Sequence, residues 1–97
     1  MNNRIYISGP ITGIKNYIET FMAAEEKLSK KGYTVINPAK VLANMPDDTT
    51  WSEYMLLALM MLSMADKIYM LKGWENSRGA RIEHVEAVGR GMEIEYQ

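Results

Sequence analysis

The sequence predicts an α/β fold, a three-layer sandwich in which a small parallel sheet of about four strands lies between helices. Short segments rich in β-branched and aromatic residues alternate along the chain with longer segments of helical periodicity. Glycine-rich loops follow the first and the third of these short segments. A length of 97 residues leaves room for one domain, which we expect to cover residues 1–97.

The first strand and the first helix are marked by a change of pattern. Residues 4–7 are β-branched and aromatic, and glycine and proline in the loop 8–13 end the strand. Apolar residues then recur at helical spacing over 17–31, where acidic residues precede basic ones, as the helix dipole favours. Gly32 stands where a helix commonly ends.

A second strand is expected at 33–36, followed by a loop of mixed polarity as far as Thr50. Thr50 and Glu53 have the spacing of a capping box, so we expect a helix to begin there and to run to about Ala65. At about 15 residues this helix is too short to span a bilayer, which needs about 20. Because it is apolar on nearly every side, we expect it in the core or in a homodimer interface, with a ligand groove as the alternative. Its methionines are Met55, Met60, Met61 and Met64.

The last third of the chain repeats the alternation. Asp66 opens a strand at 67–71, a second glycine-rich loop occupies 73–79, and a helix follows to about Val88. The segment 92–96 alternates polar and apolar residues, as a half-exposed edge strand does. Four strands separated by three helices imply a Rossmann-like or flavodoxin-like sheet, with right-handed crossovers and ligands at the carboxyl ends of the strands.

Composition argues against several classes of protein. A formal net charge of -1 argues against binding to a nucleic-acid polymer and against a polybasic membrane anchor. With no cysteine and one histidine, the chain lacks the ligands of a zinc ribbon or a multi-histidine metal site, so we expect no metal and no cofactor. The first residues do not have the pattern of a signal peptide, so we expect a cytoplasmic location.

The first loop has neither the glycine spacing of a dinucleotide-binding turn nor the lysine of a phosphate-binding loop. Its backbone N–H groups and two hydroxyls could still bind an anion or a sugar, and a plain strand-to-helix turn is the alternative. The candidate substrate-binding residues here are Ser8, Gly9, Pro10, Thr12 and Gly13.

The second loop opens a helix, so free N–H groups, the Ser77 hydroxyl and the Arg78 guanidinium could converge there on a phosphate or on sugar hydroxyls. Glu83 follows, with Ala80 and Ala87 one turn to either side, so we expect a hollow beside the carboxylate. The helix dipole favours the ionised form, which suits a nucleophile, and a solvated surface glutamate is the alternative.

Three aromatic side chains, Trp51, Tyr54 and Trp74, could stack on a base or could serve as packing anchors. Trp74 is nearest to Glu83 in the sequence, and we take Trp74 and Asp66 as further candidate substrate-binding residues. His84 lies round the helix from the face that carries Glu83, so we do not expect it to take part directly in the chemistry.

Four segments, 5–13, 37–38, 65–71 and 73–83, together resemble a known group of proteins. They are similar to the nucleoside 2-deoxyribosyltransferase-like superfamily, and most closely to its small, often phage- or prophage-encoded DUF4406-type branch. The resemblance covers nearly the whole chain. Its sharpest element is the pattern S-x-G-x-x-x-E-x-x-x-A, met by Ser77, Gly79, Glu83 and Ala87, and Tyr6 matches a tyrosine of the first strand.

The resemblance implies a nucleoside or nucleotide as the small-molecule substrate. In the better-known relatives the corresponding glutamate attacks the anomeric carbon of 2-deoxyribose. The resemblance thus implies that Glu83 is the nucleophile and that Tyr6 positions it. It also implies that Ser77 and Gly79 bind the 5′ end of the nucleoside or nucleotide. It implies N-glycosidic cleavage or base exchange on a 2′-deoxynucleoside or its 5′-monophosphate.

One position departs from the family pattern. Several catalytic relatives carry an aspartate about two helical turns before the residue that corresponds to Asp66, and here that position falls near Ala58. Either an acid such as Glu75 or Asp66 replaces it, or the chain binds a nucleotide without turning it over. A non-catalytic nucleotide-binding protein of the same fold is therefore the alternative.

Overall fold

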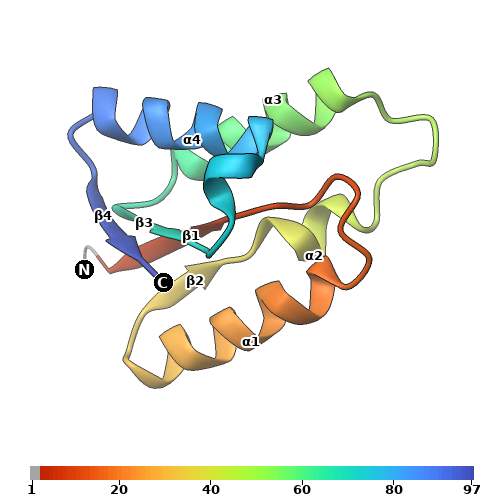
Figure 1. Ribbon diagram of the computed structural model, residues 1–97. Helices are drawn as coiled ribbons and strands as arrows, with labels where there is room; N and C mark the ends of the chain where they lie inside the picture. Colours follow the sequence, from red (N-terminus) through yellow and green to blue (C-terminus); the bar gives the residue numbers. More distant parts are fainter. Residues whose placement is uncertain (1–2) are drawn as a thin grey trace.

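A computed structural model of the chain describes residues 3–97. Within them four strands form one parallel sheet in the order β2-β1-β3-β4, and helices cover both of its faces (Figure 1). The elements are β1 (Arg4–Ser8), α1 (Tyr17–Lys30), β2 (Thr34–Ile36), α2 (Pro38–Leu42), α3 (Trp51–Leu62), β3 (Lys67–Met70), the 3-10 turn η1 (Trp74–Asn76), α4 (Arg78–Gly89) and β4 (Glu93–Tyr96). The predicted α/β sandwich is thus confirmed.

The sheet separates two apolar layers because side chains alternate between the faces of a strand. Ile5 and Ile7 of β1 belong to the layer in which Phe21 and Leu28 of α1 pack. Tyr6 lies on the other face, in the layer that α3 and α4 complete. Figure 1 shows α1 on one side of the sheet and both α3 and α4 on the other. Residues 6 and 8 of β1 are therefore directed toward α4.

The loop expected after β2 contains a short helix, α2, that the sequence pattern does not predict. Its five residues are too few to display a helical apolar period. The helix forms because Pro38 occupies the first turn and the Asn37 side chain accepts a hydrogen bond from the N–H of Ala39 at 3.0 Å.

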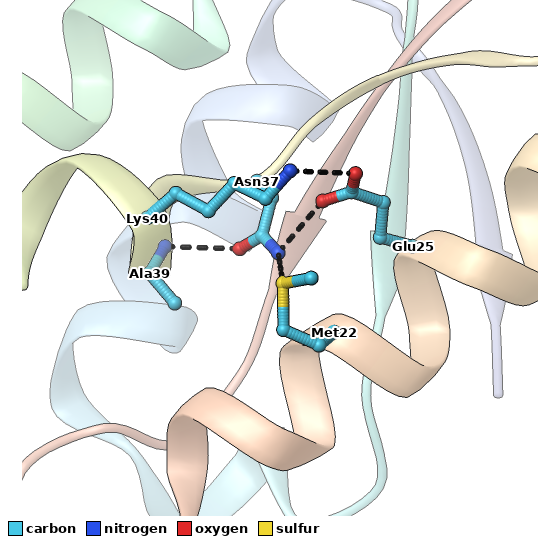
Figure 2. A network of polar contacts seen from close by, with 5 residues as sticks. All are labelled: Met22, Glu25, Asn37, Ala39 and Lys40. Carbon is cyan, nitrogen blue, oxygen red and sulfur yellow. Dashed lines mark hydrogen bonds and ion pairs between the residues drawn. The ribbon is translucent and has the colours of Figure 1, made fainter.

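Asn37 also ties α2 to α1, as Figure 2 shows. Its amide donates to Glu25 Oε1 at 3.0 Å and contacts the sulfur of Met22, and Lys40 Nζ donates to Glu25 Oε2 at 2.8 Å. Partial burial alone would raise the pKa of Glu25, but the hydrogen bonds from Lys40 and Asn37 lower it. This network fixes the position of α2 against α1.

Helix α3 begins at the expected capping box, in which Thr50 and Glu53 exchange hydrogen bonds. One side of α3 packs in the core through Ala58, Met61 and Leu62. The other side remains in solvent, where Leu56 is 63% and Met60 is 59% exposed. In residues 3–97 no helix combines the length and the apolar character needed to cross a membrane.

The strand order determines where a ligand can enter. The chain moves from β1 to β2 on one side and later to β3 on the other, so the two connections diverge at the carboxyl ends of β1 and β3. Such a topological switch point leaves a crevice outside the sheet. Both glycine-rich loops begin there, because one follows β1 and the other follows β3.

Candidate functional site

A cavity of about 860 Å³ occupies the crevice at the carboxyl ends of β1 and β3. This volume falls within the roughly 300–1,000 Å³ of small-molecule sites. Its walls come from the loop after β1, the loop after β3, the amino-terminal turns of α4, one face of α3, and parts of α1 and α2. The cavity is therefore a candidate site for a ligand of nucleotide size.

Glu83 of α4 is held at the wall of this cavity, with only 5% of its surface exposed. Tyr6 Oη donates to Glu83 Oε2 at 2.5 Å, and Ser8 Oγ donates to Glu83 Oε1 at 2.6 Å. Both donors lie on β1 two residues apart, so strand alternation directs them to the same face. Each carboxylate oxygen thus has a hydroxyl donor, and the carboxylate is fixed in one orientation.

Burial raises the pKa of Glu83, and the hydrogen bonds from Ser8 and Tyr6 oppose this rise without cancelling it. Burial also raises the pKa of Tyr6, and the neighbouring carboxylate raises it further. Burial of the charge therefore acts against the ionised form of Glu83, which the helix dipole is expected to favour.

The start of α4 forms a second wall. Ser77 Oγ accepts a hydrogen bond from the N–H of Ala80 at 3.2 Å, so this hydroxyl caps the helix. The Arg78 guanidinium lies 4.4 Å from the ring centre of Trp51 on α3, in cation–π geometry. A Cβ on Gly79 would stand 3.1 Å from Met55 Sδ, so the small residue lets α3 and α4 approach closely.

Most of the predicted site residues come together around this cavity. Those that line it are Tyr6, Gly9, Pro10, Thr12, Ser77, Arg78, Gly79 and Glu83. Ser8 contributes through Glu83 and not as part of the wall. Gly9 packs against Leu71, which directly follows β3, since a Cβ on Gly9 would stand 2.7 Å from Leu71 Cδ1.

Three predicted substrate-binding residues lie away from the wall. Asp66 precedes β3 and lies at the amino ends of the strands, whereas the cavity lies at their carboxyl ends. Its Oδ2 accepts a hydrogen bond from the N–H of Arg4 at 3.0 Å. Trp74 stacks on His84, with ring centres 4.3 Å apart, so it is a packing anchor and not a wall of the cavity. Gly13 makes a turn with φ of 77°. None of the three is among the residues that line the cavity.

The hollow expected beside Glu83 lies on the side of Ala80. Ala80 lines the cavity, whereas Ala87 is buried in the core. Ala58 of α3 does line it, and Glu83 is the single carboxylate among the lining residues within 3–97. Neither Glu75 nor Asp66 replaces the missing acid at this wall.

Several lining residues were not among the predicted site residues. Lys72 lies in the loop after β3, and Tyr17 and Phe21 lie on α1, remote from both loops. Trp51 and Tyr54, which could stack on a base or serve as packing anchors, also line the cavity. Lys72 could have been found from its place at the end of a central strand. The aromatic residues of α1 gave no signal beyond ordinary helical periodicity. No cluster of three or more His, Cys, Asp or Glu side chains suited to a metal occurs within 3–97.

The fold and this cavity define a single-domain α/β protein with a small-molecule cleft at the switch point of its sheet. Compared with protein families, residues 3–96 match the family described as a domain of unknown function, DUF4406, and the chain belongs to that family. A search of curated proteins found no match to the chain.

Proposed function

We propose that this protein cleaves the N-glycosidic bond of a 2′-deoxynucleoside or its 5′-monophosphate, or exchanges its base, with Glu83 as the nucleophile. The observation that carries the proposal is the buried carboxylate that two hydroxyls orient at the wall of a nucleotide-sized cavity. The resemblance of the S-x-G-x-x-x-E pattern to the nucleoside 2-deoxyribosyltransferase-like superfamily supports it.

The chemistry takes place in two steps. A Glu83 oxygen bonds to C1′ while the C1′–N bond breaks, and the departing base takes the bonding electron pair and a proton from solvent. Water or a second base then bonds to C1′ and releases a proton to solvent, and the ester electrons return to Glu83. Both steps pass through transition states with oxocarbenium character, which a nearby carboxylate stabilises by its charge. Tyr6 and Ser8 hold the carboxylate in position throughout.

The start of α4 is the proposed site for the 5′ end of the substrate. Arg78 and Lys72 provide positive charge at the cavity, and the N–H groups of the first turn of α4 favour an anion. Ser77 and Gly79 would act through this first turn, because the Ser77 hydroxyl caps it.

A nucleotide-binding role without turnover is the second candidate. The specific observation in its favour is that Glu83 is the single carboxylate in the described cavity wall, with Ala58 where an acid would assist. General acid–base assistance is worth about 10²–10⁴-fold, so a site without it is slow on ordinary bases.

A panel of deoxynucleosides and their monophosphates, analysed by chromatography for free base with and without an acceptor base, tests the two roles. Release of base supports the enzyme, and exchange with the acceptor identifies a transferase. Saturable binding without release supports the binding protein. If the protein neither binds any of these compounds nor releases base from them, both roles are contradicted.

A further inference from the structure

Among the described residues 3–97, no cation pairs with the charge of Glu83. Both of its hydrogen bonds come from neutral hydroxyls, and none of the ion pairs includes it. Of the two cations that line the cavity, Arg78 is engaged over the Trp51 ring and Lys72 forms no ion pair with Glu83. A buried carboxylate without an opposite charge is costly. A positively charged ligand beside it would remove that cost.

The cavity also lacks a group suited to protonating a departing base. Its described wall contains no histidine and no second carboxylate. Histidine and carboxyl side chains are the usual general acids, because their pKa values lie closest to the working pH. Tyr6 already donates its proton to Glu83. Apart from Glu83 itself, the described wall therefore contains no side chain of these usual types.

We infer that the base of the preferred substrate carries a permanent positive charge next to the glycosidic bond. This inference rests on the proposed function and narrows its substrate class. Nucleotides of nicotinamide and of N7-alkylated purines have such bases. When their C1′–N bond breaks, the electron pair neutralises the ring, so the base leaves without a proton. Water then bonds to C1′, the Glu83 carboxylate is regenerated, and one proton passes to solvent.

Both observations lead independently to the same ligand chemistry. A cationic ring near C1′ would pair with the Glu83 carboxylate in the ground state and would favour its ionised, nucleophilic form. Because a cationic base leaves as a neutral ring, its departure requires no acidic side chain at the position of Ala58. The aromatic side chains of the wall, Tyr54 among them, provide surfaces on which a cationic ring can stack.

The test compares 7-methyl-2′-deoxyguanosine 5′-monophosphate with 2′-deoxyguanosine 5′-monophosphate, which differ by one methyl group and one charge. The 2′-deoxyribose form of nicotinamide mononucleotide serves as a second cation. Binding to the wild type is measured by calorimetry and base release by chromatography, and the release rate with Glu83→Gln is subtracted as the spontaneous rate. We expect the methylated nucleotide to bind at least about tenfold more tightly, because close charge pairs couple strongly, and this preference to vanish in Glu83→Gln.

The rate of base release is the second measurement. The enzymatic acceleration over the spontaneous rate should be at least about 100-fold larger for the methylated nucleotide, which is the low end of the effect of a general acid. Equal binding and equal acceleration for the two nucleotides would overturn the inference and leave the proposed function intact. A charge-dependent binding preference without any release would support the cationic ligand and contradict the proposed enzyme. If none of the three compounds is bound and none releases its base, both the inference and the proposed function are overturned.

Discussion

Tyr6 and Glu83 lie 77 positions apart in the chain, yet the phenol donates to the carboxylate at 2.5 Å. The contact joins the first strand to the last helix and lies inside the protein. Ser8 donates to the other carboxylate oxygen at 2.6 Å. Because both hydroxyls come from a buried strand, the carboxylate keeps one orientation relative to the cavity, which is the positioning that covalent catalysis needs.

Replacing Glu83 with Gln should lower base release by orders of magnitude, because the amide keeps the size of the side chain and loses the nucleophilic oxygen. Circular dichroism should show an unchanged fold. Glu86→Gln is the matched control on the same helix, since it removes only a surface pair with Arg90 that is worth about 0.3–0.5 kcal/mol. Full activity of the Glu83→Gln variant would contradict the assignment.

A slow substrate bearing fluorine at the 2′ position should trap the glycosyl-enzyme, because fluorine destabilises the oxocarbenium-like transition state. Peptide mapping by mass spectrometry should then find the added sugar on Glu83. A label on Glu75, Glu86 or Asp66 would mean that a different carboxylate is the nucleophile.

Tyr6→Phe should move the acid limb of the kcat/KM profile to higher pH. The Tyr6 hydrogen bond lowers the pKa of Glu83 against the effect of burial, so its removal leaves a carboxylate that ionises later. A hydrogen bond to a charged group contributes about 1.5–3 kcal/mol, which corresponds to about one to two pH units. Ser8→Ala should act in the same direction. Carbon-13 NMR of the Glu83 carboxyl checks the shift independently, and an unmoved titration in both variants would exclude this role.

Glu83 should make the protein less stable as pH rises. Burial raises its folded-state pKa above the unfolded value near 4.5, so between the two values the folded chain binds more protons than the unfolded chain. The contribution of Glu83 to the free energy of unfolding is therefore complete below the unfolded pKa and declines as pH rises toward the folded pKa. Urea denaturation of wild type and Glu83→Gln between about pH 4 and 8 measures this contribution as the difference between the two curves. Parallel curves would contradict it.

Gly9→Ala should destabilise the protein by about 1–3 kcal/mol through overpacking. The new Cβ would stand 2.7 Å from Leu71 Cδ1 and 2.8 Å from Leu71 Cβ, and the second of these atoms cannot move without the backbone of Leu71, which directly follows β3. Gly89→Ala is the control, since no heavy atom lies within 4 Å of its added Cβ. That variant should be neutral or more stable by about 0.4–1 kcal/mol. Equal denaturation midpoints for the two variants would be inconsistent with close packing at Gly9.

We also propose that the protein forms a homodimer through the exposed face of α3. Sedimentation at micromolar concentration should give about twice the chain mass of 11.1 kDa. Leu56→Lys combined with Met60→Lys should yield monomers, because it places charge on the most exposed apolar side chains of that helix. Ile18→Lys, at an exposed apolar position of α1, should leave the mass unchanged. A measured wild-type mass of 11.1 kDa, that of one chain, would contradict the homodimer.

The order of strands and helices could be predicted because each signal is local. Period-2 and period-3.6 patterns report which face of a segment is buried, and Thr50 with Glu53 marks a helix start through contacts only three residues apart. Helix α2 escaped prediction because five residues hold too little of a period. Glu83 could be singled out since its helix, its loop and its alanine neighbours are all adjacent in sequence.

Local sequence patterns were enough to predict the α/β class, the two loops and the candidate carboxylate. Which residues share the cavity depends on the tertiary structure: Asp66 lies at the amino ends of the strands, Trp74 stacks on His84, and Lys72, Tyr54 and Ala58 line the wall. The direction in which the pKa of Glu83 moves also depends on it, because burial raises that pKa. The physical reason is that burial and side-chain direction depend on packing between segments far apart in the chain, whereas a local pattern records only its own segment.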